Sequence, residues 1–238
     1  MQEDLPCPPF SDGEIAFYKR FIREPALSRN AMLKSTVERW GFCERHAFGL
    51  LTVSASIPRS GLNTAATLYL HTSANAITVL DRHPLGRAGG LRLLRNPEQC
   101  PMCELGVNQD SRGLIHREWL ALPNSLARLG SLLNATDEYW RPTACPDCGG
   151  SGAGVFCRRH FIERLPDDEA SLDRAELTVQ RSFLEACRRS LEQYLLTFDP
   201  DGIGAVTGEG IAALIAAAGW CSGWEKLLHV DGYTKSDV

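Results

Sequence analysis

The chain has 238 residues, of which 44% are hydrophobic, and a formal net charge of −4 at pH 7. This apolar content is enough for an ordinary core and excludes disorder over most of the chain, while the slightly negative charge argues against general binding to nucleic acids. The longest apolar run, over residues 211–218, is far shorter than the ~18 residues of a membrane-spanning helix, and the first residues show no secretory signal. We therefore expect a soluble, cytoplasmic protein that binds neither nucleic acid nor a membrane.

Helices are the predicted elements along the whole chain. Ser11 and Glu14 have the spacing of a capping box before the apolar stretch 15–22, which predicts a short helix. Apolar residues at helical spacing predict further helices over 26–40, 43–53, 61–80, 113–133 and 171–197, with short helices from residue 211 onward. Ser171 is the expected N-cap of the longest of these helices, and Cys187 falls on its apolar face. Cys187 is therefore expected in the core.

Residues 81–97 are basic and contain several glycines, which is typical of a solvated connection between two parts of a chain. The expected division is an N-terminal helical half over residues 1–96 and a C-terminal half over residues 97–238, which could also form one compact domain. The predicted fold class is mainly α.

The chain contains nine cysteines, and their spacing indicates metal binding. Soft or borderline ligands occur as four pairs with two intervening residues, namely Cys43 with His46, Cys100 with Cys103, Cys145 with Cys148, and Cys157 with His160. A structural zinc ion takes four such ligands in a tetrahedron, and two intervening residues let one tight turn present both members of a pair. Eight ligands therefore predict two Zn²⁺ ions per chain, held in two Cys3His sites that join two degenerate helical halves.

The assignment of ligands to ions follows from loop length. Cys145, Cys148, Cys157 and His160 lie within a short glycine-rich segment that lets the chain double back, and short loops have the lower closure entropy. This predicts one site from these four residues. The second site then consists of Cys43, His46, Cys100 and Cys103, which come from distant segments.

Two other uses of the cysteines stay open at this point. Thioredoxin-like redox chemistry needs a βαβ context, which the sequence does not show, and it leaves the two histidines unexplained. Iron–sulfur ligation is conceivable for six cysteines, although histidine is an exceptional ligand there.

The two halves share a pattern. Phe-Cys-x-Arg-His occurs at residues 42–46 and again at 156–160, and a Cys-Pro element precedes each copy. The upstream element of the first half is Cys7-Pro8-Pro9-Phe10, where Phe10 stands in the place of a second cysteine.

This repeated plan resembles an uncharacterised bacterial family defined only as a domain of unknown function. The resemblance covers most of the chain and depends on Cys43 with His46, Cys100 with Cys103, and Cys157 with His160. It implies a metal-binding plan and a different assignment of ligands, in which Cys100, Cys103, Cys157 and His160 share one ion. Cys145 and Cys148 would then complete the site of Cys43 and His46.

Three functions are compatible with these residues. The first is a helical zinc protein that acts through contact with another protein, for example as an accessory subunit of a bacterial enzyme complex, because four protein ligands leave no open position on the metal. The second is a zinc-thiolate enzyme of alkyl or group transfer, with an open site near Cys7, Cys43 and His46. The third is a thiol redox switch that releases zinc.

Overall fold

A computed structural model describes residues 10–23, 26–57, 61–82, 91–95, 99–114, 122–152, 154–165, 174–198 and 206–230. Every regular element in these ranges is a helix and none is a strand, which confirms the mainly α fold class. None of the described helices is both long and apolar enough to cross a lipid bilayer.

The N-terminal part of the chain forms four helices. These are α1 (Asp12–Arg23), α2 (Ala26–Glu38), α3 (Glu44–Ser56) and α4 (Gly61–Arg82). The capping box predicted before α1 is present, because the Ser11 amide donates to Glu14 Oε2 over 2.8 Å and the Glu14 amide donates to Ser11 Oγ over 3.1 Å. α2 ends earlier than predicted, since Trp40 has a φ of 63° and Gly41 a φ of 89°, values that do not continue a right-handed helix.

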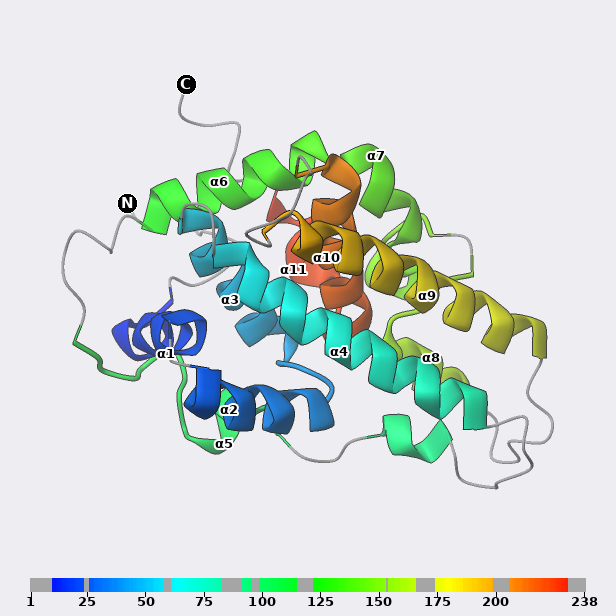
Figure 1. Cartoon of the computed structure of the whole chain (residues 1–238), viewed down its shortest axis with the longest axis horizontal. Coiled ribbons are helices and arrows are strands. Elements are labelled where there is room, and N and C mark those ends of the chain that lie inside the picture. Colours follow the sequence, from blue (N-terminus) through cyan, green and yellow to red (C-terminus); the bar gives the residue numbers. More distant parts are fainter. Residues whose placement is uncertain are drawn as a thin grey trace.

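The remaining elements are shorter, apart from three helices. They are η2 (Leu91–Leu94), α5 (Pro101–Glu104), α6 (Leu122–Ala135), α7 (Asp137–Trp140), η4 (Arg141–Thr143), η5 (Pro146–Cys148), α8 (Arg158–Arg164), α9 (Arg174–Leu196), α10 (Gly208–Ser222) and α11 (Glu225–Leu228), where η denotes a 3-10 helix. α4 and α9 lie side by side and run in opposite directions (Figure 1).

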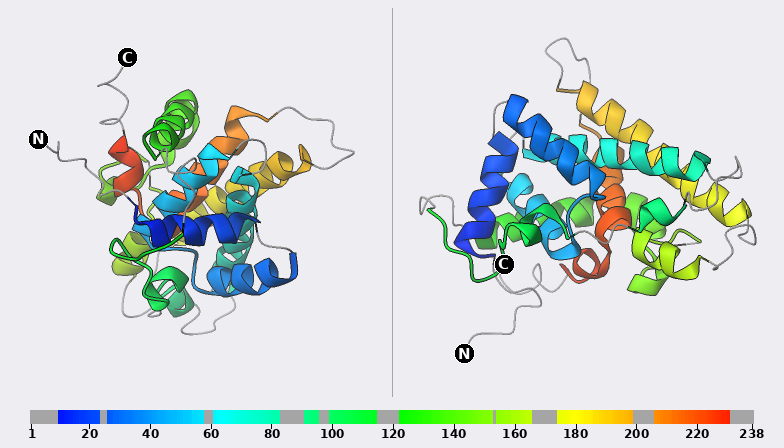
Figure 2. Two further views of the ribbon diagram at one scale, coloured as in Figure 1. Left: turned by 90° about the vertical axis from the view of Figure 1, so that its left-hand side faces the viewer. Right: turned by 90° about the horizontal axis from the view of Figure 1, so that it is seen from below.

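The helix α10 lies near the middle of the molecule (Figure 2) and packs against α3, α4, α6, α7, α8 and α9. Almost every residue from Gly210 to Cys221 is buried, as expected of a helix that is hydrophobic on all sides. Its small residues let neighbouring aromatic rings approach closely. A Cβ added at Gly219 would lie 2.4 Å from the indole ring of Trp224, so a larger residue there would displace that ring.

Two predictions about the middle of the chain are wrong where the structure describes it. Gly113 is not helical, because it packs on the carbonyl oxygen of Asp12 at the start of α1, and α6 begins only at Leu122. Residues 91–94 of the predicted solvated connection form η2, in which Leu91 and Leu94 are fully buried. The predicted N-cap Ser171 and residues 115–121 lie outside the described ranges.

Candidate metal centres

The four ligand pairs have the same local backbone. The first cysteine of each pair is the N-cap of a helix or 3-10 turn, with φ and ψ of −64° and 166° at Cys43, −64° and 159° at Cys157, −60° and 153° at Cys100, and −55° and 127° at Cys145. The second ligand then lies in the first turn of the helix, on the same side as the N-cap side chain. Pro101 and Pro146 occupy the first helical position, where the fixed φ of proline favours the turn.

The structure brings the eight ligands together in two groups of four. We call Cys43, His46, Cys100 and Cys103 the first cluster, and Cys145, Cys148, Cys157 and His160 the second cluster. In each cluster the four ligand atoms all lie within 4.8 Å of one another, so each can hold a metal ion. This confirms the assignment predicted from loop length and contradicts the assignment implied by the family resemblance, because Cys100 and Cys103 lie with Cys43 and not with Cys157.

The first cluster joins the start of α3 to α5. His46 Nδ1 lies 3.2 Å from both Cys43 Sγ and Cys100 Sγ, and 3.4 Å from Cys103 Sγ. The Sγ atoms of Cys100 and Cys103 are 3.3 Å apart, and those of Cys43 and Cys103 are 3.8 Å apart.

The second cluster is built within one short segment. His160 Nδ1 lies 3.3 Å from Cys145 Sγ, 3.4 Å from Cys148 Sγ and 3.3 Å from Cys157 Sγ. The Sγ atoms of Cys148 and Cys157 are 3.7 Å apart.

Glycines near Cys148 allow the second cluster to close, as predicted. Gly149 has a φ of 89°, and a Cβ added at Gly150 would lie 2.5 Å from the carbonyl oxygen of Ala144. The Gly150 amide donates to the Cys145 carbonyl over 3.0 Å, so the turn folds back onto its own first ligand. Only a residue without a side chain fits this close approach.

These separations match the distances between ligand atoms around a single tetrahedrally coordinated ion. Zn–S bonds of about 2.3 Å and Zn–N bonds of about 2.0 Å give edges of about 3.8 Å between sulfurs and about 3.5 Å between sulfur and nitrogen. The observed edges lie within about half an ångström of these values. All described cysteines are free thiols, and no described strand provides the βαβ context of a thioredoxin site.

The thiols also influence one another electrostatically. A hydrogen bond from Cys43 lowers the pKa of Cys100 to about 3, despite the opposing effect of burial, and a hydrogen bond from Cys157 lowers the pKa of Cys148 to about 6. Burial acts in the opposite direction on Cys103 and Cys145, whose pKa values it raises. A divalent cation among the sulfurs would remove this conflict, because it stabilises the thiolate form of all three.

A buried carboxylate lies behind the imidazole of the first cluster. Glu14 is 0% exposed, and its Oε1 lies 3.4 Å from His46 Nε2, the ring nitrogen that faces away from the thiols. This separation is long for a hydrogen bond, and His46 Nε2 has no closer partner among the described residues. Carboxylate–histidine–metal arrangements of this kind orient the imidazole and increase its basicity as a ligand.

Glu14 is itself held by several donors. Arg45 donates from Nε to Oε1 over 2.7 Å and from Nη2 to Oε2 over 2.9 Å, and the Ser11 amide also donates to Oε2. Burial raises the pKa of this carboxyl, but the nearby His46 imidazole and the hydrogen bonds from Arg45 and the Ser11 amide outweigh it and lower the pKa to about 2. Glu14 is therefore ionised, and its charge is matched by Arg45 within the core.

The imidazole of the second cluster has a different environment. His160 Nε2 lies 3.1 Å from Arg159 Nη2, which is paired with Glu225, and 4.0 Å from the exposed carboxylate of Glu163. No buried carboxylate is among these partners. The two clusters thus share ligand types but differ in what supports the histidine.

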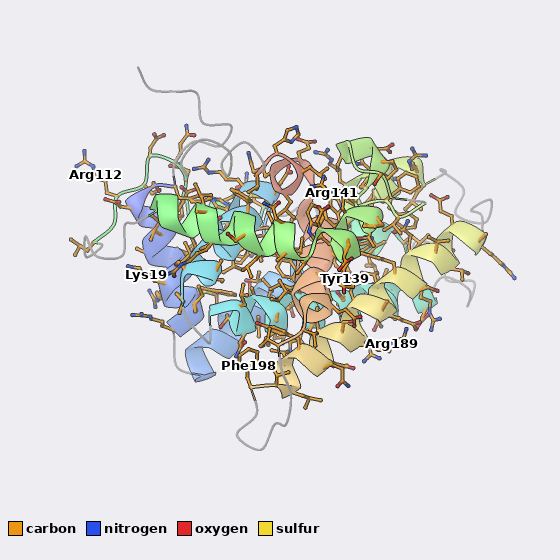
Figure 3. All side chains as sticks on the ribbon, turned by 90° about the horizontal axis from the view of Figure 1, so that it is seen from above. Lys19, Arg112, Tyr139, Arg141, Arg189 and Phe198 are labelled. Atoms are coloured by element: carbon orange, nitrogen blue, oxygen red, sulfur yellow. The ribbon has the colours of Figure 1, made fainter. Side chains whose placement is uncertain are left out.

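A cavity of about 200 Å³ lies between α7, α9 and α10, away from both clusters. Its lining includes Tyr139 of α7, which Figure 3 labels, and the four alanines Ala186, Ala212, Ala213 and Ala216. None of the eight cluster residues lines it.

Three further residues were of interest in the sequence, namely Phe10, Cys187 and Cys7. Phe10 is buried against Tyr18 and Phe48, so it is a core residue where the pattern suggested a missing ligand. Cys187 is buried in the core, as predicted. Cys7 lies outside the described residues.

Sequence reasoning missed Glu14 as a partner of His46. The capping box explained its presence completely, and the only further signal was an acidic residue on a helix expected to be amphipathic. The chain matches no protein-family model, no curated protein and no solved structure. Its function is therefore argued from the two clusters alone.

Proposed function

We propose that the chain is a zinc protein that holds two Zn²⁺ ions, one in each cluster. The observation that supports this most strongly is the convergence of three thiols and one imidazole nitrogen within 4.8 Å, twice in one chain. Sulfur and imidazole donors in a tetrahedral set of four are the usual environment of structural zinc. The small size of each set fits one ion better than a multi-iron cluster.

The proposed role of both ions is structural. All four positions of a tetrahedral ion are taken by protein atoms, so none is left for substrate or water. The first cluster ties His46 to Cys100 across 54 residues, and the second ties Cys148 to Cys157 across 9 residues. Binding at such sites contributes directly to folding.

We propose further that the folded chain acts by binding another protein, as an accessory subunit of a bacterial enzyme complex. The closed ligand sets favour this over the zinc-thiolate enzyme, because Cys43 and His46 share their cluster with two more thiols and leave no open site. The described cavity also lies away from the sulfurs that an enzyme would use.

Metal analysis of the full-length protein tests the proposal that the chain holds two zinc ions. We expect two zinc ions per chain and no absorption in the visible range. One ion or fewer after purification without chelators, or iron with charge-transfer absorption, would contradict the proposal.

Affinity purification from native cells, followed by reconstitution from purified components, tests the proposal that the chain binds another protein. We expect a stoichiometric complex that dissociates when a chelator is added. A metal-loaded chain that turns over an alkyl donor by itself would instead support the enzyme hypothesis.

A further inference from the structure

The two clusters are oriented in opposite ways relative to the protein surface. In the first cluster the imidazole is buried at 2% exposure, and the side chains of Cys43 and Cys103 are only half-buried. In the second cluster all three cysteines are buried, and His160, at 9% exposure, is the member nearest the solvent. The least buried members of the first cluster are therefore two cysteines, whereas the least buried member of the second is its histidine.

The accessible sulfurs belong to one edge of the first cluster. Cys43 Sγ and Cys103 Sγ are 3.8 Å apart, and the residues directly after Cys103 are exposed, with Leu105 at 66%. In the described part of the chain, a small molecule can thus approach Cys103 from solvent. Exposure is one of the properties that determine which cysteines are oxidised.

A second sulfur lies in position to react with an oxidised Cys103. Cys100 Sγ is 3.3 Å away, on the preceding turn of backbone, and the N-cap geometry places both sulfurs on one side of α5. A disulfide needs a separation of about 2.05 Å, so the two atoms must move by little more than about 1 Å. The three cysteines of the second cluster are all buried.

We propose that Cys103 is a site of oxidation by small hydroperoxides, and that its oxidation opens the first cluster through a Cys100–Cys103 disulfide. This inference rests on the proposed zinc binding. It assigns the two clusters different roles, since the second cluster stays intact.

The peroxide is the two-electron oxidant in the proposed reaction. The Cys103 thiolate attacks one peroxide oxygen, the O–O bond breaks, and uptake of a proton gives a sulfenic acid and one water or alcohol. The Cys100 thiolate then attacks the Cys103 sulfur, the S–S bond forms, and the departing hydroxide is protonated to water. The two sulfurs lose two electrons, which the peroxide gains. The cluster is left with Cys43 and His46, too few ligands to retain a metal ion.

Opening the first cluster would separate α5 from α3. α5 is also joined to the residue that follows α2, through the ion pair between Arg39 and Glu104 near the surface. The segment after α5 crosses the start of α1, where the Gly13 amide donates to the Ser111 carbonyl over 3.0 Å. Oxidation at Cys103 would therefore loosen the packing of this segment on α1, and a thiol reductant with zinc would restore it.

The test uses the full-length protein, whose zinc content is measured first. The protein is then treated with limiting hydrogen peroxide in the presence of a chromogenic chelator that reports released zinc. We expect loss of one of the two ions, with a Cys100–Cys103 disulfide in the peptide map and unmodified Cys145, Cys148 and Cys157. Equal loss from both clusters, or a first disulfide within the second cluster, would overturn the inference and leave the zinc proposal intact. A chain without zinc before peroxide is added would overturn both.

Cys7→Ser provides a matched control, because Cys7 takes no part in the proposed reaction. This variant should release zinc at the rate of the parent protein. Slower release, or a disulfide that contains Cys7 in the parent, would show that Cys7 is the resolving thiol and would refute the assignment to Cys100. Adding a dithiol and zinc after oxidation should recover two ions per chain.

Discussion

Glu44 and Arg158 each follow the first cysteine of a Cys-x-x-His pair, and they hydrogen-bond the start of α11 and the end of α10 respectively. Glu44 Oε1 accepts from the backbone amide of Lys226 over 2.9 Å, and Arg158 Nε donates to the carbonyl of Cys221 over 3.2 Å. The acidic residue thus meets free amides at a helix start and the basic residue meets carbonyls at a helix end, in accord with the helix dipole. Both clusters are therefore anchored where α10 ends and α11 begins.

Arg158→Met tests this anchoring. Arg158 also donates from Nη1 to the Leu94 carbonyl over 2.7 Å, so the variant leaves two carbonyls in a largely buried place without their donor. We expect a loss of roughly 2–4 kcal/mol in the free energy of unfolding, measured by chemical denaturation. The neighbouring Arg159→Met removes an exposed pair with Glu225 and the contact with His160 Nε2, and it should cost less than about 1 kcal/mol. Equal costs would contradict the anchoring role.

Glu14→Gln tests the support of the first histidine. The variant keeps the shape of the side chain and removes its charge, so zinc affinity at the first cluster should fall by about 10- to 100-fold. Competition with a chromogenic chelator measures this, with the second cluster as an internal reference. Glu163→Gln is the matched control, because its exposed carboxylate lies 4.0 Å from His160 Nε2 and should change affinity little. A similar effect from both variants would refute a special role for Glu14.

Gly150→Ala tests the turn of the second cluster. The added Cβ would lie 2.5 Å from the Ala144 carbonyl oxygen, so the turn must shift and the second cluster should lose its ion first on titration with a chelator. We expect a destabilisation of at least about 1–3 kcal/mol. At Gly106 an added Cβ would meet no atom within 4 Å, so Gly106→Ala should show only the backbone cost of its φ of 69°, about 1–2 kcal/mol. Retention of both ions by Gly150→Ala would contradict this prediction.

Chelation of the parent protein should lower its melting temperature and helicity together, as followed by circular dichroism. A ligand present at 100 times its dissociation constant stabilises the fold by about 2.7 kcal/mol, and this contribution disappears when the ligand is removed. Cys145→Ser should reproduce part of the effect with one ion lost. Cys187→Ser, which alters a buried cysteine outside both clusters, should retain two ions although its hydroxyl costs about 1–3 kcal/mol. An unchanged melting curve after complete chelation would argue against a structural role.

The ligand sets could be predicted from sequence because their chemistry is local. Each pair needs only a tight turn, and the glycines around Gly150 show that the second cluster closes on itself. The contact of Glu14 with His46 could not be predicted in this way. It joins residues on two helices, and the capping role of Glu14 already accounted for its place in the sequence.

Tertiary packing also explains the errors at helix ends. Gly113 has no local reason to leave a helix, but its close contact with Asp12 requires an extended chain without a side chain. Leu91 and Leu94 likewise lie in a basic, glycine-bearing stretch, and only the surrounding helices make them core residues. Such contacts depend on segments far away in the chain.

The unequal spans of the two clusters have a consequence for synthesis on the ribosome. The second cluster can form as soon as one short segment has emerged, because its two ligand pairs are separated by the 9 residues from Cys148 to Cys157, whereas His46 must wait for Cys100, 54 residues later. Closing the longer loop costs about 1.6 kcal/mol more in chain entropy. During that interval Cys43 and His46 form an incomplete pair on the nascent chain. The availability of zinc while the middle of the chain is being translated therefore bears on the first cluster, whereas the second can acquire its ion independently.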